Sequence, residues 1–243
     1  MSIFHGTNPN GTWQLFVLDE FTSGSGSIGG GWSITITMAL APPTSAVSRK
    51  THSFAGNFDV NLPLTGTPGI ECRSGGAAGN YQMVVTFASP VTFANARVTT
   101  GTGNVSSATA SGNQITVNLT GVTAAESIVV TINAVSDGVN SGNVTIPMSI
   151  LVGDTNADGF VDAIDVAQTK SQSGTAVSSL NFREDLNADG FIDSTDTALD
   201  KSKSGGSLQV KNIPSRESAD FESLLDERRD VHDRPLVPRV NHK

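Results

Sequence analysis

A twelve-residue acidic segment occurs twice in this chain, and the two copies start 31 residues apart. Residues 154–165 read DTNADGFVDAID, and residues 185–196 read DLNADGFIDSTD. The segments that follow also repeat, as KSQSG at 170–174 and KSKSG at 201–205. Two copies with matched flanks indicate an internal duplication, so we expect two equivalent structural units here.

Each copy has the spacing of an EF-hand calcium loop, D-x-N-x-D-G-x5-D, with aspartate at position 12. Such a loop turns oxygen ligands at positions 1, 3, 5, 7, 9 and 12 toward one ion. Glycine at position 6 permits the sharp bend, and position 7 contributes only its backbone carbonyl. Mg²⁺ is the weaker candidate, because it prefers octahedral geometry and retains water. The spacing therefore predicts two Ca²⁺ ions, held by Asp154, Asn156, Asp158, Phe160, Asp162 and Asp165, and by Asp185, Asn187, Asp189, Phe191, Asp193 and Asp196.

The charge distribution points to the same segment. The chain has 23 acidic and 15 basic residues, a net charge of -8, and residues 151–205 alone hold 10 acidic and 4 basic ones. Like charges this close repel, so without metal the loops should open. The acidic balance argues against nucleic acid or an anionic membrane as the main partner. No apolar run approaches the roughly 18 residues of a membrane span.

The duplicated unit, residues 153–205, resembles a type I dockerin, in which two calcium loops are each followed by a short helix. We expect these helices at 165–173 and 196–204. The resemblance implies binding to a cohesin domain of a scaffoldin or cell-surface protein. The two copies differ at the recognition positions, so the partner stays open between a cohesin-like domain and the chain's own upstream domains. By the resemblance, the docking face includes loop positions 10 and 11 and basic helix residues, namely Ala163, Ile164, Lys170, Ser194, Thr195, Lys201 and Lys203.

Residues 50–152 have the pattern of an antiparallel β-sandwich similar in plan to immunoglobulin-like modules. Short runs with alternating apolar residues are separated by Gly, Asn and Ser turns. With 25 glycines and only 16% charged residues, the composition is typical of secreted all-β modules. We expect strands at 58–64, 81–87, 91–98, 114–119, 127–134 and 143–151.

Two further β-type runs, at 12–18 and 32–38, lie on either side of a Gly/Ser-rich loop. The pattern over residues 3–40 resembles the last two strands of a P domain. That domain is the jelly-roll-like sandwich that follows the catalytic domain of kexin-like and bacterial subtilisin-like proteases. Residues 1–40 would then be the end of a truncated P-domain-like sandwich, followed by a Pro-rich linker at 41–49. Residues 206–243, with charges of both signs, are expected to be a disordered tail.

No catalytic constellation is visible in the sequence. The single Cys72 lies in loop-type sequence and cannot form an intramolecular disulfide, and the four histidines do not cluster like zinc ligands. The predicted fold is mainly β, with a partial jelly roll, a β-sandwich and a small α calcium-loop module. We expect a non-catalytic, calcium-binding interaction region of a secreted or cell-surface bacterial protein. The alternative is an accessory region of a secreted enzyme, either a subtilisin-like endopeptidase or a polysaccharide-degrading glycoside hydrolase. The N-terminus has no signal peptide, which favours a truncated start.

Overall fold

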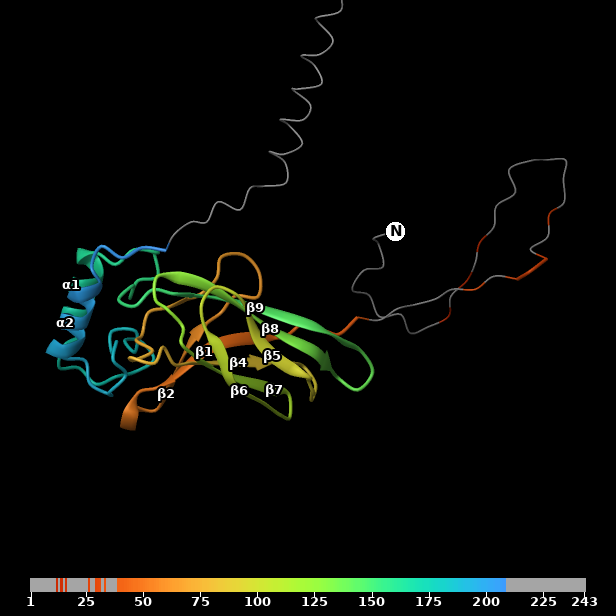
Figure 1. The fold of residues 1–243 in the computed structure, drawn as a ribbon, viewed down its shortest axis with the longest axis horizontal. Helices are drawn as coiled ribbons and strands as arrows, with labels where there is room; N and C mark the ends of the chain where they lie inside the picture. The colour runs from red at the N-terminus through yellow and green to blue at the C-terminus, as the bar shows by residue number, and fades with distance from the viewer. Residues whose placement is uncertain are drawn as a thin grey trace, which may run out of the picture.

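The computed structural model describes residues 39–208 and a few isolated residues before them, at 12, 14, 16, 26, 29–31 and 33. Residues 45–150 form two β-sheets, and two short helices lie together at one end of them (Figure 1). A mainly β fold with a small helical unit is therefore confirmed. The runs at 12–18 and 32–38 that carry the P-domain resemblance, and the tail beyond 208, lie outside the part of the chain described as continuous structure.

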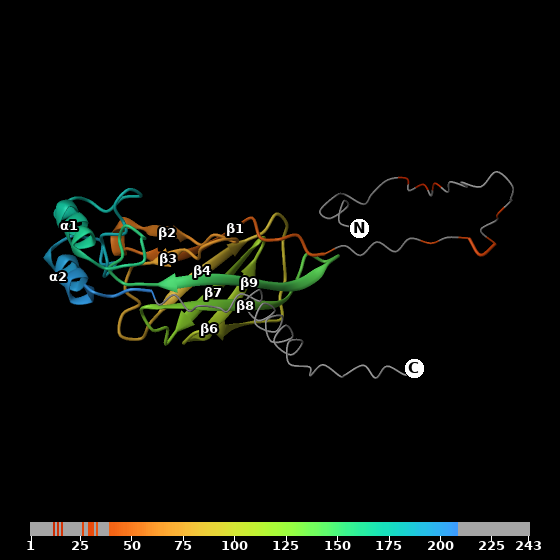
Figure 2. The ribbon, with the colours of Figure 1, turned by 90° about the horizontal axis from the view of Figure 1, so that it is seen from above.

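The two sheets pack face to face (Figure 2). The first sheet has the order β2-β1-β4-β7-β6, built from Asn57–Asn61, Ser45–Thr51, Tyr81–Thr86, Gln114–Thr120 and Asn104–Ser111. The second has the order β3-β9-β8-β5, built from Ile70–Glu71, Ser141–Ile150, Glu126–Ser136 and Asn95–Thr100. All neighbouring strands are antiparallel except β3 and β9, which run parallel.

One hydrophobic core fills the space between the sheets. Met83 and Ile115 from the first sheet and Ile128 and Ile146 from the second are fully buried in it. In β7 and β9 the neighbours of Ile115 and Ile146 are more exposed, as the alternating pattern predicts, whereas in β4 Val84 is buried beside Met83. Burial of each such side chain contributes about 1.5–3 kcal/mol. The sandwich therefore has a well-packed core of its own, next to the two helices and their loops.

The six predicted strands correspond to β2, β4, β5, β7, β8 and β9, but three strands were missed. β1 starts at Ser45, inside the range predicted as linker, so the sandwich begins earlier than residue 50. Its inward-facing residues are Ala46 and Ser48, which are too small and polar to give an apolar alternation. β6 is an edge strand of Ser, Ala, Thr and Asn with mostly exposed side chains, and β3 has only two residues.

Helices α1 (Ala163–Gln172) and α2 (Ser194–Lys203) begin two residues earlier than the sequence predicts. The reason is a reciprocal capping box. Asp162 and Asp193 are the N-cap residues, and Asp165 and Asp196 at N3 accept from the N-cap backbone. Neither helix, nor any other in the described range, is long and apolar enough to cross a bilayer.

Backbone pairing continues from the last strand of the sandwich almost to the start of the first loop. β9 ends at Ile150, and the parallel pairing with the β3 region continues beyond it. Leu151 N donates to Glu71 O at 3.0 Å, and Gly153 N donates to Cys72 O at 3.0 Å. The first loop begins one residue later, so the loop–helix unit is attached to the sheet by backbone hydrogen bonds.

Candidate functional site

Each acidic loop is folded around its first aspartate. Asp154 is buried, and its Oδ1 and Oδ2 accept from Asp158 N at 3.1 Å and Gly159 N at 2.9 Å. The second loop repeats this geometry with the same distances, from Asp189 N and Gly190 N to Asp185. The 31-residue duplication in the sequence is therefore a structural duplication as well.

The aspartate at position 12 closes each loop and also caps its helix. Asp165 Oδ1 accepts from Asn156 N at 3.2 Å, and its Oδ2 accepts from Asp162 N at 2.9 Å. Asp196 makes the corresponding bonds at 3.2 and 3.0 Å. This second role could have been found from the D-x-x-D spacing, which is a capping-box variant with aspartate at both ends.

The electrostatics of the loops favour a bound cation. Burial raises the pKa of Asp154, and repulsion from Asp165 adds to the rise. Burial likewise raises the pKa of Asp196, with repulsion from Asp185 and Asp189. Burial and the neighbouring carboxylates thus disfavour the charged forms of Asp154 and Asp196, and a divalent ion in each loop would oppose both effects.

The donor set also fits calcium, although carboxylates alone do not complete a site. In the described range, no three His, Cys, Asp or Glu side chains converge closely enough to hold a metal ion. An ion in either loop would therefore also need the amide oxygen at position 3 and the carbonyl at position 7. These are the hard oxygen donors that Ca²⁺ takes in loops of this spacing.

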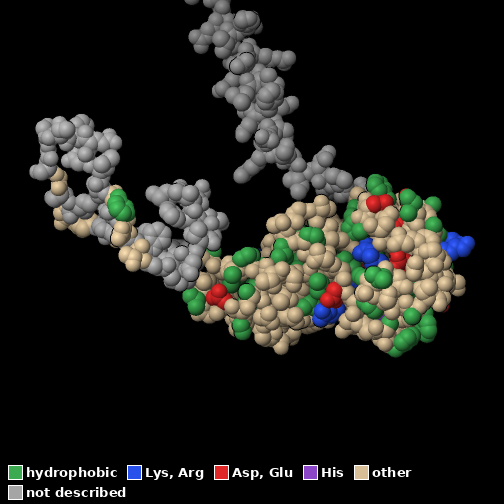
Figure 3. Space-filling view, turned by 180° about the vertical axis from the view of Figure 1, so that it is seen from behind, with side chains coloured by type: hydrophobic (Ala, Val, Ile, Leu, Met, Phe, Trp, Pro, Cys, Tyr) green, Lys and Arg blue, Asp and Glu red, His purple; other side chains and the backbone are tan. Residues whose placement is uncertain are grey.

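The residues predicted to bind a partner are all exposed. Ala163, Ile164, Lys170, Ser194, Thr195 and Lys201 lie on the outer side of the loop–helix unit. Ile164 is 61% exposed and Phe160, at loop position 7, is 59% exposed. Charged side chains are sparse on the face of the molecule in Figure 3. At loop positions 10 and 11 the first repeat presents Ala163 and Ile164 where the second presents Ser194 and Thr195, whereas position 7 is an exposed phenylalanine in both repeats.

The second loop packs against the β-sandwich. Its first aspartate, Asp185, is 2.8 Å through Oδ2 from His52 Nδ1, and both side chains are buried. Ser74 N donates to Leu186 O at 2.7 Å. The ring of Phe54 lies 5.0 Å from that of Phe191, centroid to centroid. No motif in the sequence relates His52 to a segment 133 residues away, so sequence reasoning missed this contact.

A buried ion pair lies behind His52. Arg73 donates to Glu71 from Nε to Oε1 at 2.8 Å and from Nη2 to Oε2 at 2.7 Å, and neither side chain is exposed. Burial acts to raise the pKa of Glu71, but attraction and hydrogen bonding from Arg73, with a hydrogen bond from Ser48, outweigh it and lower that pKa. The Glu71-Cys72-Arg73 segment, expected to be an ordinary loop, is therefore interior structure.

Cys72 is a further correction to the sequence interpretation. Instead of a loop thiol it is a fully buried side chain, and burial raises its pKa to about 12. A thiol with so high a pKa is not a thiolate near neutral pH, which makes it unsuitable as a nucleophile. The only described histidine, His52, has both ring nitrogens engaged, Nε2 with Arg73 at 2.9 Å and Nδ1 with Asp185 at 2.8 Å. The described residues thus hold no catalytic triad.

Arg183 joins the two loops and the sandwich. It donates from Nε to Thr155 O at 2.7 Å, from Nη2 to Asp154 O at 2.8 Å, and from Nη1 to Ile70 O at 3.2 Å. All three acceptors are backbone carbonyls, so the guanidinium fixes the first loop and β3 relative to the segment before the second loop. This contact extends the interface beyond His52.

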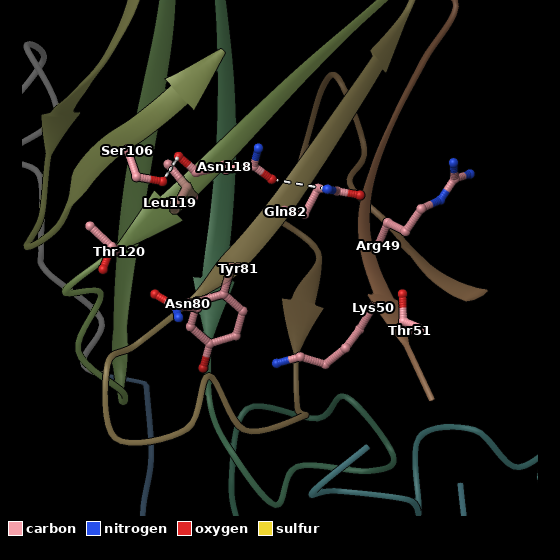
Figure 4. Close-up of a pocket in the computed structure, with 10 residues that line it drawn as sticks. All are labelled: Arg49, Lys50, Thr51, Asn80, Tyr81, Gln82, Ser106, Asn118, Leu119 and Thr120. Atoms are coloured by element: carbon pink, nitrogen blue, oxygen red, sulfur yellow. Dashed lines mark hydrogen bonds between the residues drawn. The ribbon is translucent and has the colours of Figure 1, made fainter. Parts of the chain in front are cut away.

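A polar groove of about 500 Å³ lies on the outer face of the first sheet (Figure 4). Several of its polar side chains are already paired, either with one another or with groups outside the groove. Gln82 Nε2 donates to Asn118 Oδ1 at 2.9 Å, Arg49 pairs with Asp59 at 2.7 Å, and Lys50 donates to Ser74 O. No acid pair or metal-ligand set faces the groove, so the acidic loops are the better candidate site.

Gly159 and Gly190 provide a matched test of the packing against the second loop. Their φ angles are +90° and +92°, so alanine should cost about 1–3 kcal/mol of backbone strain at either position. A Cβ at Gly190 would lie 2.9 Å from His52 O, whereas one at Gly159 would have nothing within 4 Å. We expect Gly190→Ala to cost about 1–3 kcal/mol more than Gly159→Ala in urea unfolding with calcium present. Equal costs would contradict the packing.

Asp200 gives a pH-dependent prediction. Asp200 occupies the position of the second repeat that is equivalent to Thr169 of the first. Thr169 Oγ1 donates to Asp200 Oδ2 at 2.7 Å, and Asp200 Oδ1 has no partner among the described residues. Burial raises its pKa to about 6. A raised folded-state pKa means that the contribution of this group to stability is greatest below about pH 4 and is lost as the pH rises through about 6.

Asp200→Asn should therefore unfold at a higher temperature than the wild type at pH 7.5, with the difference shrinking toward pH 4. Thermal unfolding of both proteins at several pH values, in saturating calcium so that the loop–helix unit stays folded, measures this difference. Parallel profiles would mean that Asp200 does not titrate as its burial implies.

Two loop–helix repeats, with hard oxygen donors at EF-hand spacing and a helix capped by the last loop residue, define a duplicated calcium-loop module of EF-hand type. A family model described as the Dockerin type I domain matches residues 152–202. We therefore assign a type I dockerin domain to this part of the chain, as the sequence resemblance predicted. Dockerin domains bind calcium and cohesin domains and occur in extracellular proteins. No curated protein and no solved structure gave a match.

Proposed function

We propose that residues 152–205 are a calcium-stabilised docking module that binds a cohesin-type domain, in a protein that acts outside the bacterial cell. The observation that carries the proposal is the pair of loops that curl around Asp154 and Asp185 within the dockerin match. Two ions are proposed, one in each loop, on the twelve positions predicted from the spacing. Bound calcium would supply the positive charge that holds the loop carboxylates together.

The first repeat is the better docking face. Burying apolar surface contributes about 25 cal/mol per Å², so the exposed Ile164 offers more binding free energy than Thr195 at the equivalent position, while the phenylalanine at loop position 7 is about equally exposed in both repeats. Lys170 lies on the same helix and would add a charged contact at the edge of the interface. The identity of the partner as a cohesin rests on the family match.

Binding to cohesin domains encoded in the same genome tests this proposal. Surface plasmon resonance of the full chain should show calcium-dependent binding to at least one of them. Ile164→Asp should weaken it by about 10- to 100-fold, because it places a charge in an apolar contact. The matched change Thr195→Asp, at the equivalent exposed position of the second repeat, should have an effect of a few-fold at most. No binding in calcium, or equal losses for the two variants, would argue against the proposed face.

The cellular location of the whole protein is a further part of the proposal. Secretion or cell-surface location is supported by the occurrence of dockerins in extracellular proteins and by the low charge of the sandwich. The enzyme alternatives, an endopeptidase or a glycoside hydrolase, would require a catalytic site outside residues 39–208. Within that range the sandwich acts as a rigid carrier of the docking module.

A further inference from the structure

The two loops are equivalent in sequence but not in their surroundings. Within the described part of the chain, the carboxylate of Asp154 accepts only from amides of its own loop. The carboxylate of Asp185 makes the same two bonds and has a third partner, His52 Nδ1, 2.8 Å from Oδ2. That third contact comes from the sandwich, from the turn between β1 and β2. Among the described residues, a side chain of the sandwich therefore reaches the first carboxylate of one loop only, whereas Arg183 bonds Asp154 through its backbone carbonyl.

The hydrogen-bond network fixes which nitrogen of His52 carries the proton. Arg73 Nη1 lies 2.9 Å from His52 Nε2, and a guanidinium can only donate. His52 Nε2 must therefore accept, so the proton of the neutral ring is on Nδ1. Nδ1–H donates to Asp185 Oδ2, which places a directed donor on the carboxylate.

The donor is also held rigidly in place. Arg73, which sets the orientation of the ring, is fixed by its two bonds to Glu71 and by a bond of 2.9 Å to Phe58 O. The imidazole has an edge-to-face contact with the ring of Phe58 at 5.2 Å between centroids. Every side chain from Glu71 through Arg73 and His52 to Asp185 is fully buried. Such a network has one low-energy arrangement, because a rotated ring would leave buried polar groups unpaired.

We propose that His52 is a positioning residue for the second calcium loop, so that the β-sandwich completes one of the two calcium sites. The inference rests on the proposed calcium binding. A hydrogen bond that orients a ligating carboxylate sharpens the geometry of a metal site, and loss of such outer contacts typically costs about 10- to 100-fold in affinity. The first loop has no such dependence. Calcium in the second loop and the packing of this loop on the sandwich therefore stabilise each other.

Calorimetric titration of calcium into the chelator-treated full chain, with single-loop variants, separates the two sites. Asp154→Asn leaves the second loop as the working site, and Asp185→Asn leaves the first. Adding His52→Ala to Asp154→Asn should raise the Kd of the remaining site by about 10- to 100-fold. Adding it to Asp185→Asn should leave the Kd of the remaining site unchanged.

A conservative variant guards against a general folding defect. The amide of asparagine can place an N–H near the position of Nδ1, so His52→Asn should recover much of the affinity that His52→Ala loses. Hydrogen exchange gives a second readout, since calcium should protect the amides of residues 51–58 in Asp154→Asn but not in Asp185→Asn.

The outcomes are distinct. If the wild-type chain takes up no calcium, the proposed function fails and this inference with it. If calcium binds but His52→Ala weakens both loops alike or neither, and calcium protects residues 51–58 equally in both single-loop variants, then only the positioning role is overturned.

Discussion

Replacing Arg73 by methionine should lower the free energy of unfolding by about 3–5 kcal/mol, the largest effect expected of a single substitution in the sandwich. The side chain is fully buried and donates to Glu71, His52 and two backbone carbonyls. Removing it leaves the carboxylate of Glu71 buried without its counter-ion, and desolvation of that charge dominates the cost. Urea unfolding followed by far-ultraviolet circular dichroism would measure the change.

Arg49→Met is the matched control. Arg49 also forms a two-bond pair with a carboxylate, that of Asp59, but the two side chains are 33% and 34% exposed. Solvent screening limits such a pair to about 0–1 kcal/mol. The double variant Glu71→Gln/Arg73→Met should be more stable than Arg73→Met, because it removes the unpaired charge. Equal effects of the substitutions at Arg49 and Arg73 would rule out the buried pair as a source of the stability.

Removing calcium from both loops should destabilise the loop–helix unit at least as strongly. A ligand at about 1,000 times its Kd stabilises the folded state by about 4 kcal/mol per site. The unit has little else to hold it, since its buried apolar side chains are few, Val161, Leu186 and Ile192 among them. Chelation should therefore lower the unfolding temperature, and it should expose amides of α1 and α2 to hydrogen exchange before those of β4 and β7.

The variant Asp158→Ala/Asp189→Ala, which removes the fifth residue of both loops, should unfold at the same temperature with calcium and with chelator. Glu126→Ala is the control, because Glu126 is an acidic residue of β8 outside the loops and should leave the calcium response intact. A double loop variant that still responds fully to calcium would place the ion elsewhere.

Features that depend on neighbouring residues could be predicted from the sequence. The loops, their duplication and the two helices are indicated by spacing within short segments. The predicted start of the first helix was late only because Asp162, and not Asp165, is its N-cap residue. The six predicted strands have apolar residues at alternate positions, because one face of each strand is buried in the core. β1 and β6 were missed because their small polar residues carry no such signal.

The interface between the sandwich and the second loop could not be predicted in this way. His52, Arg73 and Asp185 are far apart in the chain, and each has an ordinary local context. Polar residues in a Gly-rich segment, such as Glu71 and Arg73, indicate a turn unless their partners are known. Only the fold brings these partners together, and they can be buried because their hydrogen bonds are satisfied by one another and by nearby backbone groups.

The backbone pairing that carries β9 into the first loop has a mechanical consequence. Domains joined by a Gly/Ser-rich linker sample many orientations, and capture of one leaves the other free to turn. Here Leu151 and Gly153 bond to the β3 region, and only three residues separate β9 from Asp154. A partner that binds the docking module would therefore also fix the orientation of the sandwich.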